Sequence, residues 1–175
     1  MTASIDHNNR LSHGDEIDSL IAVLGTHSPV ERENAREGLV DIGSPAVAHL
    51  ARALAHRETQ VRWEAAKTLV EIADPASASS LVPVLEDEDA GVRWLAAEGL
   101  IALKADALAP LLSALVRRSD STWLREGAHH VLHDLKSGPL VELIAPVFLT
   151  LNHPAPEVET PVAAAKALAE LEAHG

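Results

Sequence analysis

The stretch QVRWEAAKTLVEI at residues 60–72 returns as GVRWLAAEGLIAL at residues 91–103. Val61, Val92 and Trp123 hold the same place at intervals of 31 residues, and Glu31 holds it 30 residues before Val61. We call these four residues the markers of the repeat. A small residue stands four positions after each marker and an aliphatic residue stands eight positions after it. These positions lie on one face of a helix. These residues are Ala35, Ala65, Ala96 and Gly127, and Leu39, Leu69, Leu100 and Val131. Each copy therefore predicts one helix with a buried stripe.

A second apolar series precedes each copy and predicts a second helix. Its members stand seven and eleven residues before the markers: Leu20, Leu24, Leu50, Leu54, Leu81, Leu85, Leu112 and Val116. Gly43-Ser44-Pro45 and Asp74-Pro75 separate the helices, with proline suited to a first helical turn. A helix pair of this kind cannot bury its stripe alone, so neighbouring pairs stack. The sequence predicts an all-α superhelix of about ten helices over residues 15–175, preceded by a disordered tail at residues 1–14.

The last copy is spaced differently. We take Thr160 as its marker, which places Ala164, Ala165, Leu168 and Leu171 on the stripe and Pro161 near the start of the helix. The first copy carries Glu31-Arg32-Glu33-Asn34 in place of Val-Arg-Trp, which is typical of a terminal repeat that faces water.

The pattern VRxxAAxxLxxI, with the acidic turn EDEDAG before it, resembles the HEAT repeat family. More narrowly, it is similar to the short bacterial form, of roughly 30 residues, that also occurs in phycobilisome-lyase-like proteins. The resemblance covers about residues 15–173 and implies a right-handed α-solenoid whose concave surface is lined by one helix of each pair. It carries little information about activity, because one fold hosts many functions.

Composition narrows the class of partner. A formal net charge of −12 opposes binding to phosphate backbones and acidic lipid surfaces, so neither nucleic acid nor a membrane is an expected partner. The absence of cysteine leaves no disulfide and no thiolate ligand, which favours a cytoplasmic location. The N-terminal residues lack the pattern of a signal peptide, and no later run reaches the roughly 18 apolar residues of a membrane span.

Trp63 and Trp94 lie off the buried stripe, in the same slot of two copies. One interpretation packs them between stacked repeats, and the other exposes them as anchors for a partner; both stay open. Trp123 fills the marker slot and is predicted to lie in the core. Arg62, Arg93 and Arg32 are interpreted as a structural ladder, with Glu58, Asp89 and Asp120 placed to accept their hydrogen bonds.

The second helices offer a mildly basic strip that would suit an acidic segment of another protein. We take it, together with the two tryptophans, as the candidate protein-binding residues: His49, Arg52, His56, Trp63, Trp94, Arg117 and Arg118.

One helix face carries a carboxylate and two imidazoles that could bind a metal: Glu126, His129 and His133. A single helix supplies only a weak metal site, so we expect this face to be solvated. No catalytic motif stands out, so we expect no catalytic residue, cofactor or metal. The predicted function is a non-catalytic protein-binding scaffold. The alternative is a bilin or tetrapyrrole lyase-like accessory role, with Trp63 and Trp94 stacking on the chromophore.

Overall fold

The computed structural model describes residues 13–136 and 140–174, and within these residues every regular element is a helix. The elements in chain order are α1 (His13–Val23), α2 (Pro29–Ile42), α3 (Ser44–Ala53), α4 (Thr59–Ile72), the 3-10 helix η1 (Pro75–Ser77), α5 (Ala78–Leu81), the 3-10 helix η2 (Val82–Glu86), α6 (Ala90–Leu103), the 3-10 helix η3 (Lys104–Ala107), α7 (Leu108–Arg118), α8 (Thr122–Leu135), α9 (Val141–Leu151) and α10 (Pro156–His174).

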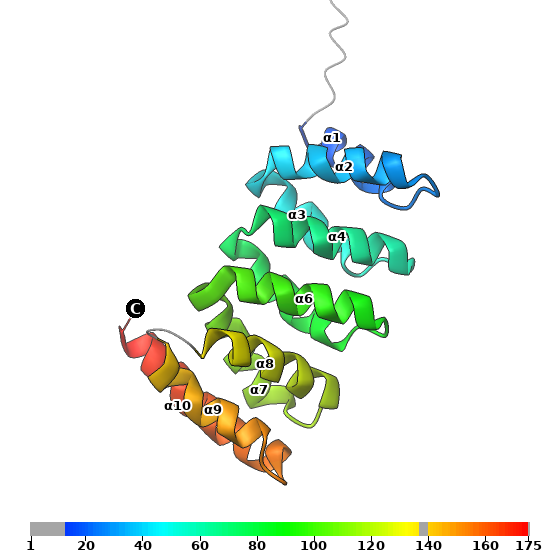
Figure 1. The fold of residues 1–175 in the computed structure, drawn as a ribbon. Helices are drawn as coiled ribbons and strands as arrows, with labels where there is room; N and C mark the ends of the chain where they lie inside the picture. The colour runs from blue at the N-terminus through cyan, green and yellow to red at the C-terminus, as the bar shows by residue number, and fades with distance from the viewer. Residues whose placement is uncertain (1–12, 137–139, 175) are drawn as a thin grey trace, which may run out of the picture.

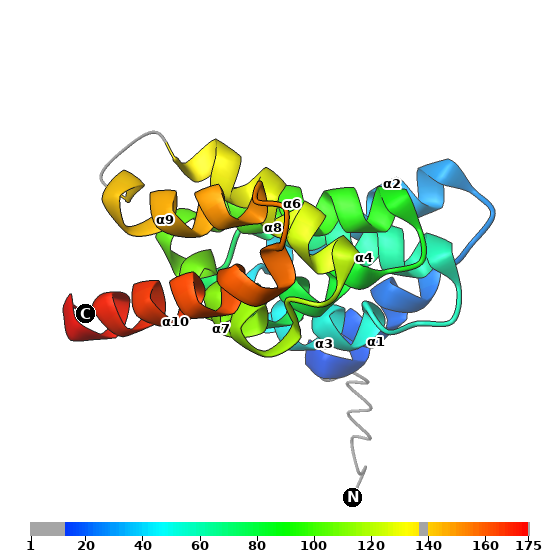
Figure 2. The same ribbon diagram turned by 90° about the horizontal axis from the view of Figure 1, so that it is seen from below.

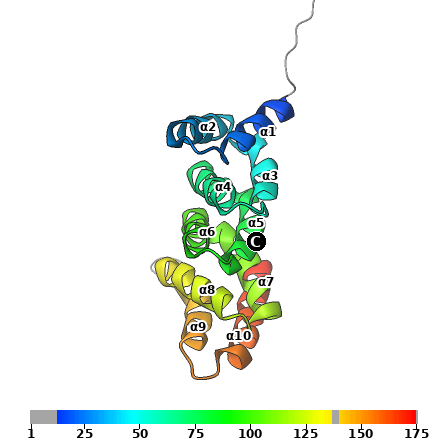
Figure 3. The same cartoon turned by 90° about the vertical axis from the view of Figure 1, so that its right-hand side faces the viewer.

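The helices stack in two layers, as Figures 1 and 3 show. The front layer contains α2, α4, α6, α8 and α9, and the back layer contains α1, α3, α5, α7 and α10. This arrangement confirms the predicted α-solenoid. Of the predicted N-terminal tail, residues 1–12 lie outside the described residues, and residues 13 and 14 already belong to α1.

Local sequence sets where the front helices begin. Ser28, Asp89 and Ser121 accept hydrogen bonds from the backbone N–H of the third residue that follows, at the starts of α2, α6 and α8. These caps satisfy N–H groups that have no partner inside the helix. The chain therefore enters three of the front helices in the same way.

Three of the front helices are followed by a residue with a positive φ angle. Gly43, Ala73 and Lys104 follow α2, α4 and α6 with φ angles of 68°, 50° and 54°. Glycine tolerates positive φ without steric cost, whereas an alanine or lysine in this region is strained. Positive φ thus recurs at this position even where the residue is unfavourable, although ψ differs: it is −134° at Gly43, 37° at Ala73 and −119° at Lys104.

The core follows the predicted stripe with two corrections in the fourth copy. In α7, Val116 is 37% exposed and its neighbour Leu115 is fully buried in its place. Trp123 is 44% exposed, whereas its neighbour Leu124 is fully buried, so the prediction that Trp123 lies in the core is wrong. The cause is one additional residue before α8, which begins at Thr122, 32 residues after α6 begins at Ala90, instead of 31. The fourth set of stripe residues is accordingly Leu124, Ala128 and Leu132, all of them buried.

The fifth pair departs from the repeat. Helix α9 packs beside α8 in the front layer and α10 returns beside α7 in the back layer, so the pair is inverted relative to the pairs before it (Figures 2 and 3). Ser119 Oγ donates to the carbonyl of Glu157 at 2.9 Å and ties the end of α7 to the start of α10. Thr160 and Ala164 are buried as predicted, but Ala165 is exposed and Pro161 lies inside α10 instead of near its start.

One helical run among the described residues, Ala90–Arg118, is long and apolar enough by length and composition to cross a membrane. It consists of α6, η3 and α7, and half of its most apolar window is buried inside the fold.

Candidate functional site

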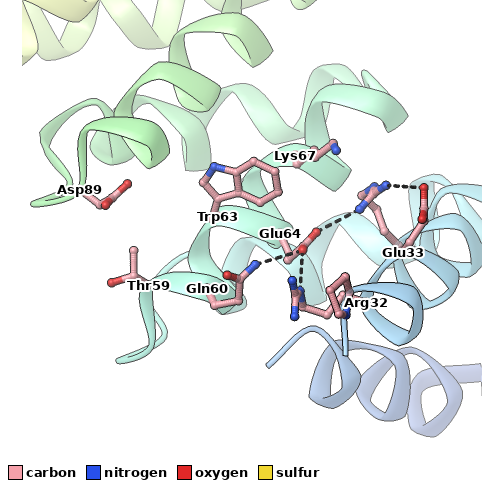
Figure 4. Close-up of a pocket in the computed structure, with 10 residues that line it drawn as sticks. Arg32, Glu33, Thr59, Gln60, Trp63, Glu64, Lys67 and Asp89 are labelled. Carbon is pink, nitrogen blue, oxygen red and sulfur yellow. Dashed lines mark hydrogen bonds and ion pairs between the residues drawn. The ribbon is translucent and has the colours of Figure 1, made fainter. Parts of the chain in front are cut away.

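A groove of about 650 Å³ lies between α2 and α4 and reaches the turn before α6 (Figure 4). Its lining combines three cations, three carboxylates and one indole ring. The lining residues are Pro29, Arg32, Glu33, Arg36, Thr59, Gln60, Trp63, Glu64, Lys67 and Asp89.

A buried carboxylate forms the floor of the groove. The Glu64 side chain is 5% exposed, and its Oε1 accepts from Arg32 Nε at 3.1 Å while its Oε2 accepts from Arg36 Nη1 at 3.1 Å. Gln60 Nε2 adds a third hydrogen bond to Oε1 at 3.1 Å. A buried carboxylate is tolerated only when it is paired and hydrogen-bonded, so this network holds both arginines of α2 against α4.

The sequence did not single out Glu64, Arg36 or Lys67. A signal was available, because Glu64 stands where α6 has the buried Leu95, 31 residues later. A carboxylate in an apolar slot of a repeat indicates a local ion-pair partner, which Arg32 and Arg36 supply.

Trp63 forms one wall of the groove and is partly buried against the core. A Cβ built on Gly91 would lie 3.4 Å from its Nε1, so the indole reaches the first turn of α6. This contact supports the packing interpretation for Trp63. On its other side, the Lys67 ammonium lies 5.2 Å from the centre of the indole ring.

The other two tryptophans are more open to solvent. Trp94 on α6 is 57% exposed and Trp123 on α8 is 44% exposed. The Arg93 guanidinium lies 4.6 Å from the centre of the Trp123 ring, in a cation–π contact. We call Trp63, Trp94 and Trp123 the tryptophan face; they stand on the first two turns of α4, α6 and α8 in the front layer.

Two cations beside the tryptophan face have no carboxylate partner among the described residues. Lys67 contacts the ring of Trp63, and Arg93 donates to the carbonyls of Asp87 and Glu88 at 2.7 and 3.2 Å while it stacks on Trp123. Both can therefore receive a carboxylate from outside the chain. The rings and cations of this face are groups that recognise a partner by stacking and ion pairing.

The predicted basic residues lie in the other layer, away from the tryptophan face. His49 and Arg52 on α3 lie 2.6 and 3.7 Å from the Asp18 carboxylate of α1, and Arg118 on α7 pairs with Glu86. Arg117 donates to Ser113 Oγ at 2.6 Å, and His56 accepts the backbone N–H of Glu58 at 3.1 Å. The structure therefore divides the predicted binding residues between two layers, and carboxylates of neighbouring helices interrupt the basic strip.

The arginine ladder exists, but its acceptors differ from the predicted ones. Arg32, Arg62, Arg93 and Arg125 each donate to the carbonyl six residues earlier in the chain. The expected carboxylates do not accept these bonds: Asp89 caps α6 instead, and Arg62 reaches into the next unit, where it binds Asp87 and Glu88. The reason is that the side chain of Arg62 extends along the stack toward the turn before α6.

The histidine cluster packs against α9. The ring centres of His129 and His133 lie 4.7 and 5.9 Å from that of Phe148, so α9 partly covers His129, whereas His133 is exposed as expected for a solvated face. Within the described residues, no group of three His, Asp or Glu side chains is placed to hold a metal ion. Glu126 stands in the same helix and is exposed.

Comparisons with known proteins agree with this architecture. The family model for HEAT repeats matches residues 47–133, and no curated protein matches the chain. The chain is similar to a chain in the structure of the complex of CpcE and CpcF of phycocyanin lyase from Nostoc sp. PCC7120. The likeness has a TM-score of 0.57 at 27% identity and covers 86% of this chain and 96% of that one.

A second solved structure, an engineered protein, gives a TM-score of 0.45 at 21% identity and covers 89% of this chain and 79% of that chain. The stacked helix pairs, the repeated stripe and the family match at residues 47–133 lead to one assignment. Residues 47–133 of the chain are HEAT repeats.

Proposed function

We propose that the chain is a non-catalytic, cytoplasmic scaffold that binds another protein across the tryptophan face and the adjoining α2–α4 groove. The observation that carries this proposal is the exposure of Trp94, at 57%, on α6, which packs between α4 and α8. On these two helices, Trp63 lies beside Lys67 and Trp123 lies beside Arg93, and both cations lack carboxylate partners among the described residues. An exposed tryptophan keeps a large apolar ring in water, which is unfavourable in free energy. Tryptophans are accordingly favoured as anchors in protein interfaces.

The same geometry indicates the chemistry of the partner segment. An apolar side chain packs on Trp94, and carboxylates on either side pair with Lys67 and Arg93. The partner segment is therefore acidic with an apolar centre. The likeness to a chain from a complex of two proteins, CpcE and CpcF, supports a role in protein assembly.

Site-specific crosslinking in the native cell tests this proposal. A photoreactive amino acid placed at Trp94 should capture one defined protein, and the same group at Arg52 in the back layer should not capture it. The substitution K67E should weaken capture at least tenfold, because it places a like charge opposite the acidic segment, whereas K104E, at a distant lysine beyond the end of α6, should leave it unchanged. Equal capture from both layers, or equal effects of the two lysine substitutions, would refute the assignment of the surface.

A second candidate function is an accessory role in handling an open-chain tetrapyrrole. The likeness to the phycocyanin lyase complex favours it, and so does the pairing of indole rings with cations at Trp63 and Trp123. Flat conjugated rings stack on indoles, and the propionate groups of a bilin would pair with Lys67 and Arg93. Incubation with free bilin should then shift its absorbance spectrum, and the shift should be reduced in W63A and in W123A. An unchanged wild-type spectrum would eliminate this role.

A further inference from the structure

Helix α10 carries two apolar seams on opposite sides. The first contains Thr160, Ala164, Ala167 and Leu171 and packs into the fold beside α7 and α9. The second contains Val158, Val162, Ala165 and Ala169 and is exposed. Each seam has the 4-3-4 spacing of the a and d positions of a coiled coil.

The exposed seam is not a scatter of single surface residues. Val158 is 66% exposed and Val162 is 72% exposed, and none of the described residues covers them. Ala173 continues the same side of the helix by one further turn, so the seam is about 24 Å long at about 1.5 Å per residue. A helix that is apolar on two sides is typically buried on two sides.

We propose that the exposed seam of α10 pairs with the same seam of a second copy of this chain, antiparallel about a two-fold axis. In this register Val158 lies opposite Ala169 of the second copy, and Val162 lies opposite Ala165. Each large residue thereby meets a small one, which is the arrangement that fills a helix interface without voids or clashes.

Net charge limits where two copies can meet. Two chains that each carry a formal net charge of −12 repel one another, so pairing needs a strip whose own side chains carry no charge, as Val158, Val162, Ala165 and Ala169 do. In an antiparallel pair, residues on the same flank of each seam face one another. This places the Lys166 ammonium, which is 78% exposed, near Glu159 of the second copy, and the two-fold axis makes the ion pair twice.

Other features of α10 and α9 fit this geometry. Among the described residues, the one ion pair of Lys166 is with Glu170, at 3.8 Å, and its side chain is 78% exposed, so the ammonium can turn toward a carboxylate of a second copy. Helix α10 packs against α7 and α9 at the end of the stack (Figure 3), and the valines on its other side are exposed. One helix pair is a small interface beside the roughly 1,200–2,000 Å² of a stable complex, so the dimer should have a micromolar dissociation constant.

Sedimentation equilibrium of the full chain tests the proposal. The wild-type chain should dimerise between about 1 and 100 μM, more strongly at higher salt because salt screens the like charges. The substitution V162E should raise the dissociation constant at least tenfold and keep the wild-type circular dichroism spectrum, because Val162 is 72% exposed in the single chain. The matched control V30E changes an equally accessible valine on α2, 64% exposed, and should dimerise as the wild type does.

Disulfide trapping then tests the register, since the natural chain has no cysteine. A mixture of V158C and A169C chains should form a mixed disulfide, and neither variant alone should form one, because antiparallel pairing keeps identical ends apart. A wild-type chain that stays monomeric to about 200 μM would overturn the proposal, as would a dimer that V162E leaves intact. A monomer whose seam instead captures a different protein would assign the seam to that protein and overturn the pairing of copies.

Discussion

Arg62 of α4 binds Asp87, in the turn before α6, through two parallel hydrogen bonds of 2.7 Å from Nε and 3.0 Å from Nη2. Both side chains are only 8% exposed. The hydrogen bond to Asp87 raises the pKa of the Arg62 guanidinium, against the opposing effect of burial. The pair therefore joins the second unit of the stack to the third with a charged contact sealed from water.

Removal of one partner should be costly. We expect R62M to lose about 3–5 kcal/mol of unfolding free energy, because it leaves the Asp87 carboxylate buried without its partner. R62M combined with D87N should recover part of that loss. The control R57M, at a side chain that is 86% exposed, should change stability by less than about 0.5 kcal/mol. Urea unfolding measured by circular dichroism gives these values, and a small effect of R62M would show that the pair does not stabilise the stack.

The register of α8 can be tested at two adjacent residues. L124A should lose about 2–5 kcal/mol, because Leu124 is fully buried and its truncation leaves a cavity. W123A should lose about 1 kcal/mol, since Trp123 is 44% exposed and gives up mainly its contact with Arg93. The same unfolding measurement compares the two variants. A larger loss for W123A than for L124A would contradict this register and indicate that Trp123 lies in the core.

Gly127 permits close approach of α8 to η2. A Cβ at this position would lie 2.8 Å from Leu85 Cδ2 and 3.2 Å from Leu85 Cβ, so G127A should destabilise the chain by about 1–3 kcal/mol despite the higher helix propensity of alanine.

Gly38 in α2 provides the matched control. Its nearest neighbour is the flexible end of Leu20, at 3.3 Å, so G38A should be neutral or stabilise by about 0.5–1 kcal/mol. Thermal melts of the two variants would contradict the packing argument if both glycines tolerated alanine equally.

Asp74 should make stability depend on pH in the acid range. The Ser44 hydroxyl and the backbone N–H of Ala76 donate to its carboxylate and hold the pKa of Asp74 below its ordinary value of 3.8. A depressed folded-state pKa contributes stability that is complete above the unfolded value and is lost as the pH falls through the lower folded value. D74N should therefore lose less stability than the wild type between pH 6 and pH 3.

The Ser44 donor can be removed separately. S44A should lie between the wild type and D74N in the same unfolding series, because the Ala76 hydrogen bond remains. An identical loss of stability between pH 6 and pH 3 in all three chains would show that Asp74 does not contribute to the pH dependence of the unfolding free energy.

Much of the fold was predictable, because a repeated helix pair is a local pattern. The spacing of alanine and leucine predicted the stripe, and Ala35, Ala65 and Ala96 are indeed buried. The error at Trp123 came from a single additional residue before α8, because a pattern counted at fixed intervals does not record an insertion. Val116 and Ala165 also matched the intervals but are exposed. Trp123 matched the interval, but Leu124 faces the core.

The candidate site was less predictable, because its groups come from different units. Glu64 meets Arg32 and Arg36 across two helices, and only their packing brings the three charges together. Trp63 and Trp94 occupy equivalent slots, yet one is partly buried and the other is 57% exposed. The difference follows from what the next unit places beside each ring, which for Trp63 is the first turn of α6 at Gly91.

The sequence by itself determined the helices, their pairing and the stripe that stacks them, because helical periodicity and repeat spacing are properties of neighbouring residues. Only the tertiary structure decided that the last pair is inverted, that the basic residues of the back layer are met by carboxylates, and that the second seam of α10 faces outward. Those outcomes depend on contacts between residues far apart in the chain, which a periodic pattern does not encode.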